Sequence, residues 1–161
     1  MRRFYGLFFI DLESRRVCLA GCTSNPTGVW VVRQARNLSF TGLFDRMRFL
    51  IHDRDSKFSP AFDEIFRSEG INVVRTPIRA PQANTYAERF VRTVRAECLD
   101  WLLIVGRRHL EHVLRSYTIH YNRERPHRAL ALLTPEPTDP IDHPPTVETI
   151  ARRDRSSTSA T

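Results

Sequence analysis

Short apolar runs alternate along the chain with longer segments in which apolar residues recur every three or four positions. The first run, residues 4–10, is almost entirely apolar and aromatic, which predicts a strand buried on both faces. Polar residues 11–15 then turn the chain back, and residues 17–22 show the alternation of a second strand. We therefore expect an antiparallel hairpin at the start of the chain.

The next segments alternate between helix and strand patterns. Asn25 and Pro26 are typical of an N-cap and a first helical residue, so they predict a helix to about Leu38. The expected inward residues of this helix are Trp30, Ala35 and Leu38. After a loop around Gly42, residues 48–53 favour a strand that ends in an acid, Asp53.

A predicted helix and then a further predicted strand follow Asp53. Ser59 and Pro60 repeat the helix-opening signal, and Gly70 predicts the end of that helix. The expected buried residues are Ala61, Phe62, Ile65 and Phe66. Residues 71–75 then predict a short strand.

Helical periodicity returns after the proline-containing segment 76–82. Asn84 is a candidate N-cap, and the expected buried stripe comprises Ala87, Val91, Val94, Cys98, Trp101 and Val105. A further helix is expected from about residue 107 to 121, with one face made by Leu110, Val113, Leu114, Tyr117 and Tyr121. From residue 134 onward prolines crowd between acids, which predicts a mobile tail. We thus expect a domain at residues 1–133 and a proline-rich, disordered tail at 134–161.

Two acids of these predicted elements are candidate metal ligands. Asp53 stands at the carboxyl end of its strand, where ligand sites of open α/β sheets lie, and we expect it to face a cleft. Glu88 stands in the first turn of the later helix, with Arg92 and Arg95 four and seven positions further along the same face. Oxygen ligands from a few carboxylates suit Mg²⁺ or Mn²⁺, and paired ions of this kind catalyse phosphodiester chemistry.

Composition favours a polyanionic partner. The 161-residue chain carries 25 basic against 18 acidic residues, a net charge of +7 and 41% apolar residues, so it is globular and basic with nucleic acid as the first candidate partner. Only Lys57 is a lysine, so part of the arginine excess is also compatible with a GC-rich genome. The three cysteines form no C-x-x-C pair, and neither a disulfide framework nor a zinc site is indicated. No segment reaches membrane length, so we expect a cytoplasmic protein without membrane contact.

Four parts of the chain together resemble the catalytic core of DDE integrases and insertion-sequence transposases. They are segment 52–58, the loop 77–88, Glu88 itself, and the run 121–130 with its Y-N-x-x-R-P-H pattern. The resemblance extends from about Tyr5 to Pro135. It implies a ribonuclease-H-like mixed sheet flanked by helices, bound magnesium, and DNA strand transfer by a hydroxyl attacking a phosphodiester. Asp53 would correspond to the second acid of the family and Glu88 to the third, while Arg92 and Arg95 would touch transposon-end DNA.

The sequence departs from the family at the first acid. The family carries that acid on a central strand preceding the hairpin, and this chain begins at the hairpin. We expect that strand to be missing, through either a truncated gene or a start assigned too late. Asp11 and Asp55 are the candidate substitutes, although an acid in a turn is the simpler interpretation of each.

The simpler structural roles of the candidate residues remain alternatives. Asp53 and Glu88 fit a solvated strand end and a helix first turn, and Arg92 and Arg95 fit a solvated helix face. For His52 and His127 we expect surface or hydrogen-bonding roles. The leading functional hypothesis is a DDE-type polynucleotidyl transferase acting on transposon-end and target DNA, incomplete as written and homo-oligomeric in a complete version. The alternatives are a catalytically inactive DNA-binding remnant and a structure-specific nuclease.

Overall fold

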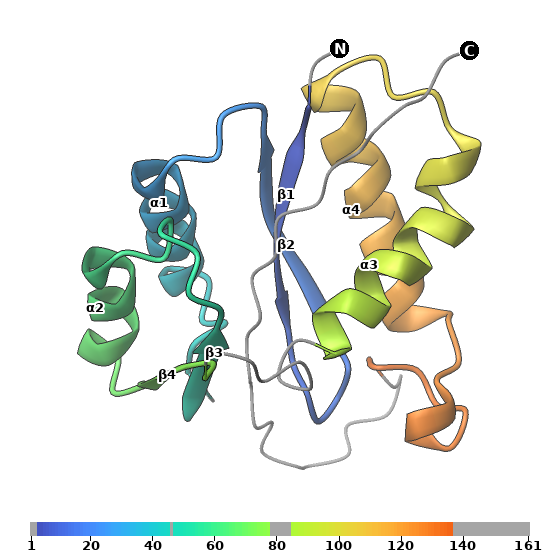
Figure 1. Ribbon diagram of the computed structural model, residues 1–161. Helices are drawn as coiled ribbons and strands as arrows, with labels where there is room; N and C mark the ends of the chain where they lie inside the picture. The colour runs from blue at the N-terminus through green and yellow to red at the C-terminus, as the bar shows by residue number, and fades with distance from the viewer. Residues whose placement is uncertain (1–2, 46, 78–84, 137–161) are drawn as a thin grey trace.

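The computed structural model describes residues 3–45, 47–77 and 85–136, which form a mixed α/β fold (Figure 1). The strands are β1 (Tyr5–Ile10), β2 (Val17–Thr23), β3 (Phe49–His52) and β4 (Asn72–Arg75). The helices are α1 (Gly28–Ser39), α2 (Pro60–Ser68), α3 (Thr85–Glu97) and α4 (Arg107–Arg123), with short 3-10 turns η2 (Leu99–Trp101) and η3 (Arg128–Leu130). Helices α1 and α2 lie on one side of the β1–β2 hairpin and α3 and α4 on the other (Figure 1).

Strand β1 is the layer shared by two hydrophobic cores. All six of its residues are buried, as its unbroken apolar run predicts. Leu7 and Phe9 join the core built with α1 and α2, whereas Phe8 and Ile10 join the core built with α3 and α4. Because successive side chains of a strand point to opposite faces, this single strand connects both helical layers. The predicted antiparallel hairpin with β2 is confirmed.

The strands form two separate sheets, in agreement with the expectation that the central strand of the predicted mixed sheet is missing. Among the described residues, β1 pairs with β2 antiparallel, β3 pairs with β4 parallel, and the two pairs are separate two-stranded sheets. No described strand lies between β1 and β3 to join them by backbone hydrogen bonds. The packing of Phe9 against Phe66 instead connects the hairpin with α2, at 6.1 Å between ring centroids.

The boundaries of α2 follow the predicted local signals. Ser59 is the N-cap residue and Pro60 lies in the first turn. At the other end Gly70 adopts a φ of +78°, a conformation that glycine tolerates without a Cβ clash. The amide of Ile71 donates to the carbonyl of Phe66 at 3.0 Å, and that of Gly70 to Arg67 at 3.0 Å, which together form a Schellman motif.

The predicted start of α1 is wrong by two residues. The N-cap is Thr27, whose hydroxyl accepts a hydrogen bond from the Trp30 amide at 3.2 Å. Asn25 instead donates its amide to the Thr23 hydroxyl at 3.1 Å, so Asn25 and Pro26 belong to the turn before the helix.

The predicted buried stripe of α3 is correct in part, with Val91 and Cys98 half-buried. Ala87 and Val94 are buried, and so is Phe90, which the predicted stripe omits. Trp101 and Val105 are 81% and 78% exposed, because α3 ends at Glu97 and η2 breaks the helical register. The candidate N-cap of this segment, Asn84, lies outside the described residues, as does most of the predicted tail, residues 137–161.

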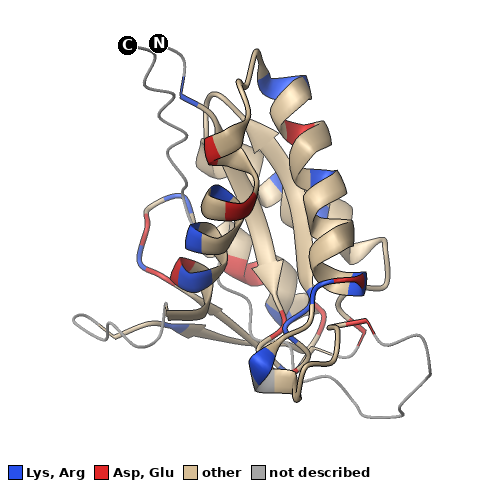
Figure 2. Ribbon diagram, turned by 90° about the vertical axis from the view of Figure 1, so that its right-hand side faces the viewer, with Lys and Arg blue, Asp and Glu red and all other residues tan. Residues whose placement is uncertain are grey.

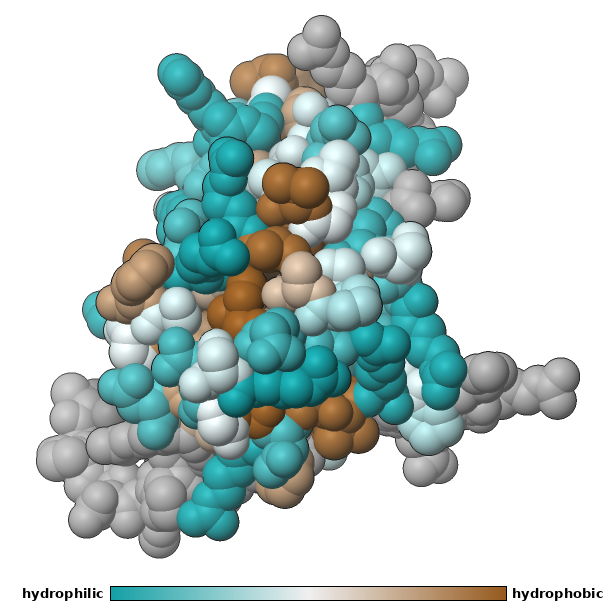
Figure 3. Space-filling model, turned by 90° about the vertical axis from the view of Figure 1, so that its left-hand side faces the viewer, coloured by the Kyte–Doolittle hydropathy of each residue, from teal (hydrophilic) through white to brown (hydrophobic). Residues whose placement is uncertain are grey.

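The surface made by α1 and α2 is mainly hydrophilic, with apolar surface near its centre (Figure 3). Exposed apolar residues of α1 and its C-cap include Val29 and Phe40. No helix within the described ranges is both long and apolar enough to span a bilayer.

Asn122 attaches α4 to the outer edge of β2. Its Oδ1 accepts from the Val17 amide at 2.9 Å, and its Nδ2 donates to the Val17 carbonyl at 2.8 Å. Both groups are buried, so the asparagine side chain supplies the bonds that a neighbouring strand would otherwise make.

Replacing Asn122 with alanine is expected to lower the free energy of unfolding by about 2–3 kcal/mol, because the Val17 amide and carbonyl lose their buried partners. Urea denaturation measures the difference. Asn37→Ala, at an exposed position of α1, is the matched control and should change stability by less than about 0.5 kcal/mol. An unchanged midpoint for Asn122→Ala would show that water replaces the side chain without cost.

Candidate nucleic-acid and metal site

Asp53 directly follows β3, as the sequence predicts, and its side chain is half-buried. Its Oδ1 accepts the amide of Asp55 at 2.9 Å, which closes a tight turn after the strand. Asp53 also lines a small pocket of about 30 Å³ whose other walls include Gly6 of β1 and Trp30 of α1. The carboxylate therefore stands at a hollow beside the start of β1.

The two candidate substitutes for the missing first acid, Asp55 and Asp11, are both held by other contacts. Both carboxylate oxygens of Asp55 lie 2.7 Å from the Lys57 ammonium, and Oδ1 also accepts the Lys57 amide at 3.0 Å. Asp11 is buried in the hairpin turn, where its Oδ1 accepts the amides of Glu13 and Ser14 at 2.9 and 3.1 Å. Both acids thus stabilise turns, which is the simpler of the two interpretations that the sequence leaves open.

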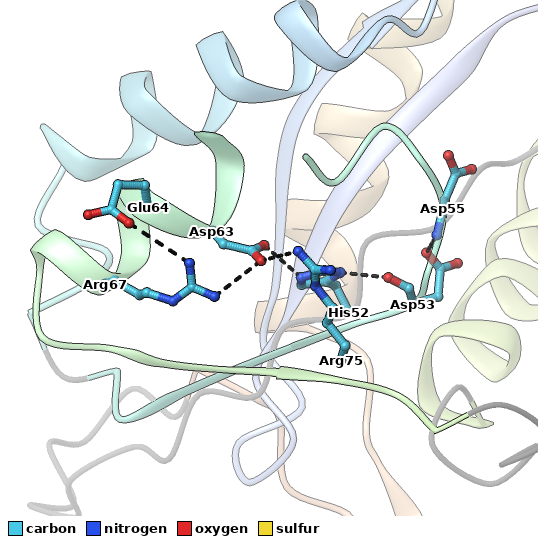
Figure 4. Close-up of polar contacts among 7 residues, drawn as sticks. All are labelled: His52, Asp53, Asp55, Asp63, Glu64, Arg67 and Arg75. Atoms are coloured by element: carbon cyan, nitrogen blue, oxygen red, sulfur yellow. Dashed lines mark hydrogen bonds and ion pairs between the residues drawn. The ribbon is translucent and has the colours of Figure 1, made fainter. Parts of the chain in front are cut away.

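A buried ionic network fixes the backbone at Asp53 (Figure 4). His52 is 1% exposed and Asp63 of α2 is fully buried, with His52 Nε2 2.9 Å from Asp63 Oδ1. The other ring nitrogen, Nδ1, lies 2.6 Å from the Asp53 carbonyl oxygen. These two contacts fix the orientation of the buried imidazole ring.

Asp63 also binds two arginines. Its Oδ2 accepts from Arg75 of β4 at 2.6 Å and from Arg67 one helical turn away at 3.3 Å. One carboxylate therefore joins the ends of β3 and β4 to α2. Of the two roles expected for His52, surface or hydrogen-bonding, the structure shows the hydrogen-bonding one, at a buried position. The sequence alone does not reveal the role of Asp63, because an acid within an apolar helix stripe indicates nothing without its partner.

Helix α3 presents the second group of candidate residues. Glu88 lies in its first turn and is exposed, as are Arg89 and Arg92. Arg95 is half-buried, and its Nε lies 3.6 Å from Asp100 Oδ1, a distance typical of a weak surface pair. Figure 2, which faces α3 and α4, shows basic and acidic residues interspersed along both helices. Among these cations, Arg89 belongs to no pattern that predicts a role for it.

The candidate metal ligands that the structure describes are two carboxylates, Asp53 and Glu88. Within the described ranges, no three His, Cys, Asp or Glu side chains are grouped as a metal ion would require. Asp53 and Glu88 provide hard oxygen donors of the kind that Mg²⁺ prefers, and Mg²⁺ commonly uses one or two carboxylates with water and substrate phosphate as further ligands. The donor chemistry therefore fits, with two protein ligands rather than three.

The Y-N-x-x-R-P-H pattern, residues 121–127, spans the end of α4 and the segment after it, and it contacts α3. Arg125 donates to Glu97 through Nε and Nη2, with distances of 2.7–3.1 Å, and the Tyr117 hydroxyl donates to Glu97 at 2.6 Å. The Arg125 bonds lower the pKa of Glu97, and burial together with the Glu97 contact raises the pKa of Tyr117. His127 is buried against Tyr121, at 4.6 Å between ring centroids, and its Nε2 lies 3.5 Å from the Tyr121 carbonyl oxygen, so the expected hydrogen-bonding role is the one observed.

Acidification is expected to destabilise the fold through His127. Burial lowers its pKa below the ordinary value of 6.5. Below about pH 6.5 the unfolded chain therefore binds a proton that the folded chain does not, and stability falls as the pH drops from there through the folded pKa. Urea midpoints at about pH 7 and about pH 5 measure the loss, which should be smaller in His127→Phe. Equal losses in both proteins would assign the effect to other groups.

One segment of the chain matches a known protein family. Residues 69–135 match a family model described as an integrase core domain. This range contains β4, α3, α4 and the Y-N-x-x-R-P-H pattern, including Glu88, Arg92 and Arg95, and it begins after Asp53. The resemblance to the catalytic core of DDE integrases and transposases is thereby confirmed, and a general role in DNA integration or transposition follows. No curated protein matches the chain.

Proposed function

We propose that this chain acts in DNA integration or transposition by magnesium-dependent phosphodiester strand transfer. The observation that carries the proposal is the exposed face of α3, which presents Glu88 and Arg92 one turn apart within the segment that matches an integrase core domain. A carboxylate next to a cation can serve a metal ion and a phosphate of the same DNA strand.

A ribonuclease-H-like fold is part of the proposal. In support of it, an antiparallel hairpin precedes a parallel strand pair, and helices cover both sides of the hairpin (Figure 1). In such a fold the carboxyl end of β3 is where a ligand site belongs, and Asp53 occupies that position.

Asp53 and Glu88 would hold the metal ion, and the network of His52 and Asp63 would keep the Asp53 backbone in place. When bound, Mg²⁺ or Mn²⁺ would supply Lewis-acid activation of the phosphodiester and of the attacking hydroxyl. Arg92 and Arg95 would contact DNA phosphates, so each would contribute to affinity without selecting a base sequence.

A second candidate function is DNA binding without cleavage. Two observations favour it. Asp55 is paired with the Lys57 ammonium, and Asp11 accepts hydrogen bonds from the backbone of the hairpin turn. If neither acid is available as a third ligand, the α3 arginines would still retain DNA while the chemistry is weak.

A strand-transfer assay with Mg²⁺ and labelled DNA separates these candidates. Joined product in the presence of Mg²⁺, and none with a chelator, would support the proposed function. Retention of DNA without any cleavage would support the binding function. Cleavage without joining would point to a nuclease and contradict strand transfer.

A further inference from the structure

A second feature with ligand-binding chemistry is a pocket between the β1–β2 turn, α3 and the segment that follows α4. Its volume is about 310 Å³, at the lower end of the range of about 300–1,000 Å³ typical of small-ligand sites. Four of its lining residues are arginines and none is acidic. The arginines are Arg15, Arg89, Arg125 and Arg128.

Arg15 supplies a donor without an acceptor at this pocket. Its Nη1 is buried and has no hydrogen-bond partner in the part of the chain that the structure describes. The guanidinium carbon lies 4.0 Å from the centroid of the Tyr86 ring, so the aromatic face fixes its position. A buried guanidinium N–H left unpaired is costly, and an anionic ligand would remove that cost.

The charge of the pocket is only partly compensated. Arg125 is paired with Glu97, and its guanidinium carbon lies 5.5 Å from the centroid of the Tyr121 ring. Within the described residues, no ion pair involves Arg15, Arg89 or Arg128. Three arginines around one pocket are typical of a site for phosphate, whose oxygens match the planar guanidinium fork.

We propose that this pocket binds the terminal phosphate of a nucleic-acid strand. The inference rests on the proposed function for its choice of a nucleic acid over a small phosphate compound. Arg89 and Arg92 lie three positions apart on α3, so the mouth of the pocket shares a helix face with the proposed DNA contacts. A strand bound along α3 would therefore place its end at Arg89.

The burial of the Arg15 guanidinium favours a strand end over an internal phosphate as the ligand of this pocket. Arg15 lines the pocket and its Nη1 is shielded from solvent, so a ligand group that binds this arginine has to enter the pocket. An internal phosphate carries a sugar on either side, whereas a terminal phosphate is attached on one side only and bears more negative charge. A duplex interior would contact the exposed Arg89 and Arg128 without reaching Arg15.

The experiment is a binding titration in a chelator-containing buffer with three forms of one trinucleotide, which carry a 5′-phosphate, a 3′-phosphate or hydroxyls at both ends. The proteins are the wild type, Arg15→Asn, Arg89→Gln and the control Arg33→Gln, which removes an exposed charge from α1. Asparagine suits position 15 because the backbone there has a φ of +65°, which asparagine tolerates. Arg89→Gln, at an exposed site, tests the pocket even if Arg15→Asn unfolds.

We expect the wild type to bind one phosphorylated form about tenfold more tightly than the hydroxyl form. Arg15→Asn and Arg89→Gln should each remove most of that preference, and Arg33→Gln should keep it. Equal affinity for all three forms, or equal weakening by all three variants, would overturn the inference. Binding of inorganic phosphate that no trinucleotide displaces would assign the pocket to a free anion and also overturn it. No metal or catalysis is needed, so a protein without strand transfer that keeps the preference would contradict the proposed function alone.

Discussion

Replacing Asp63 with alanine is expected to lower the free energy of unfolding by about 3–5 kcal/mol, which for a domain of this size is enough to impair folding at physiological temperature. Asp63 is fully buried and binds the ring of His52 and the guanidinium groups of Arg67 and Arg75. Alanine would leave His52, which is also buried, without its acceptor. It would also disconnect β4 from α2 at this point.

The two arginines contribute less to this expectation than His52 does. Their side chains are 46–49% exposed, so water can solvate their charges once the carboxylate is gone. The main cost arises at the buried His52–Asp63 pair, where neither group can reach solvent.

Urea denaturation followed by circular dichroism measures the change. Asp63→Asn keeps the shape and one acceptor oxygen, so it should lose less stability than Asp63→Ala. Glu64→Ala is the matched control, because Glu64 is the exposed neighbour on the same helix and its pair with Arg67 is long at 3.8 Å. A loss under about 1 kcal/mol in Asp63→Ala would show that the network is solvated in solution.

Replacing Glu88 with glutamine is expected to abolish strand transfer under the proposed function. Glutamine keeps the size of the side chain and its hydrogen-bonding capacity, but a neutral amide is a poor ligand for a hard divalent cation. Glu88 is exposed, so the fold should be retained. DNA binding should also persist, because Arg92 and Arg95 are unchanged and a neighbouring negative charge is removed.

The measurements are the yield of joined DNA and the affinity for Mn²⁺. We expect Glu88→Gln and Asp53→Asn each to weaken Mn²⁺ binding by about tenfold or more, since each removes a proposed ligand. Glu69→Gln, an exposed change at the end of α2, is the control and should alter neither quantity. Wild-type yield and Mn²⁺ affinity in Glu88→Gln would remove this residue from the site.

The segment 121–128 illustrates how a motif can indicate a family before its physical role is known. The pattern by itself indicates no contact. In the structure Asn122 supplies edge bonds to β2, Arg125 binds Glu97, and His127 packs on Tyr121. These partners lie from 6 to 105 residues away in the sequence, so only folding brings most of them together.

The sequence by itself determined the features that depend on neighbouring residues. The unbroken apolar run of β1, the Ser59 and Pro60 start of α2, the Gly70 stop and the position of Asp53 after β3 all follow from local conformational preference and side-chain alternation. Only the tertiary structure decided the rest. It showed the burial of Asp63 with His52 and the gathering of Arg15, Arg89 and Arg128 around one pocket. These features depend on contacts between distant segments, whose energies no local pattern contains.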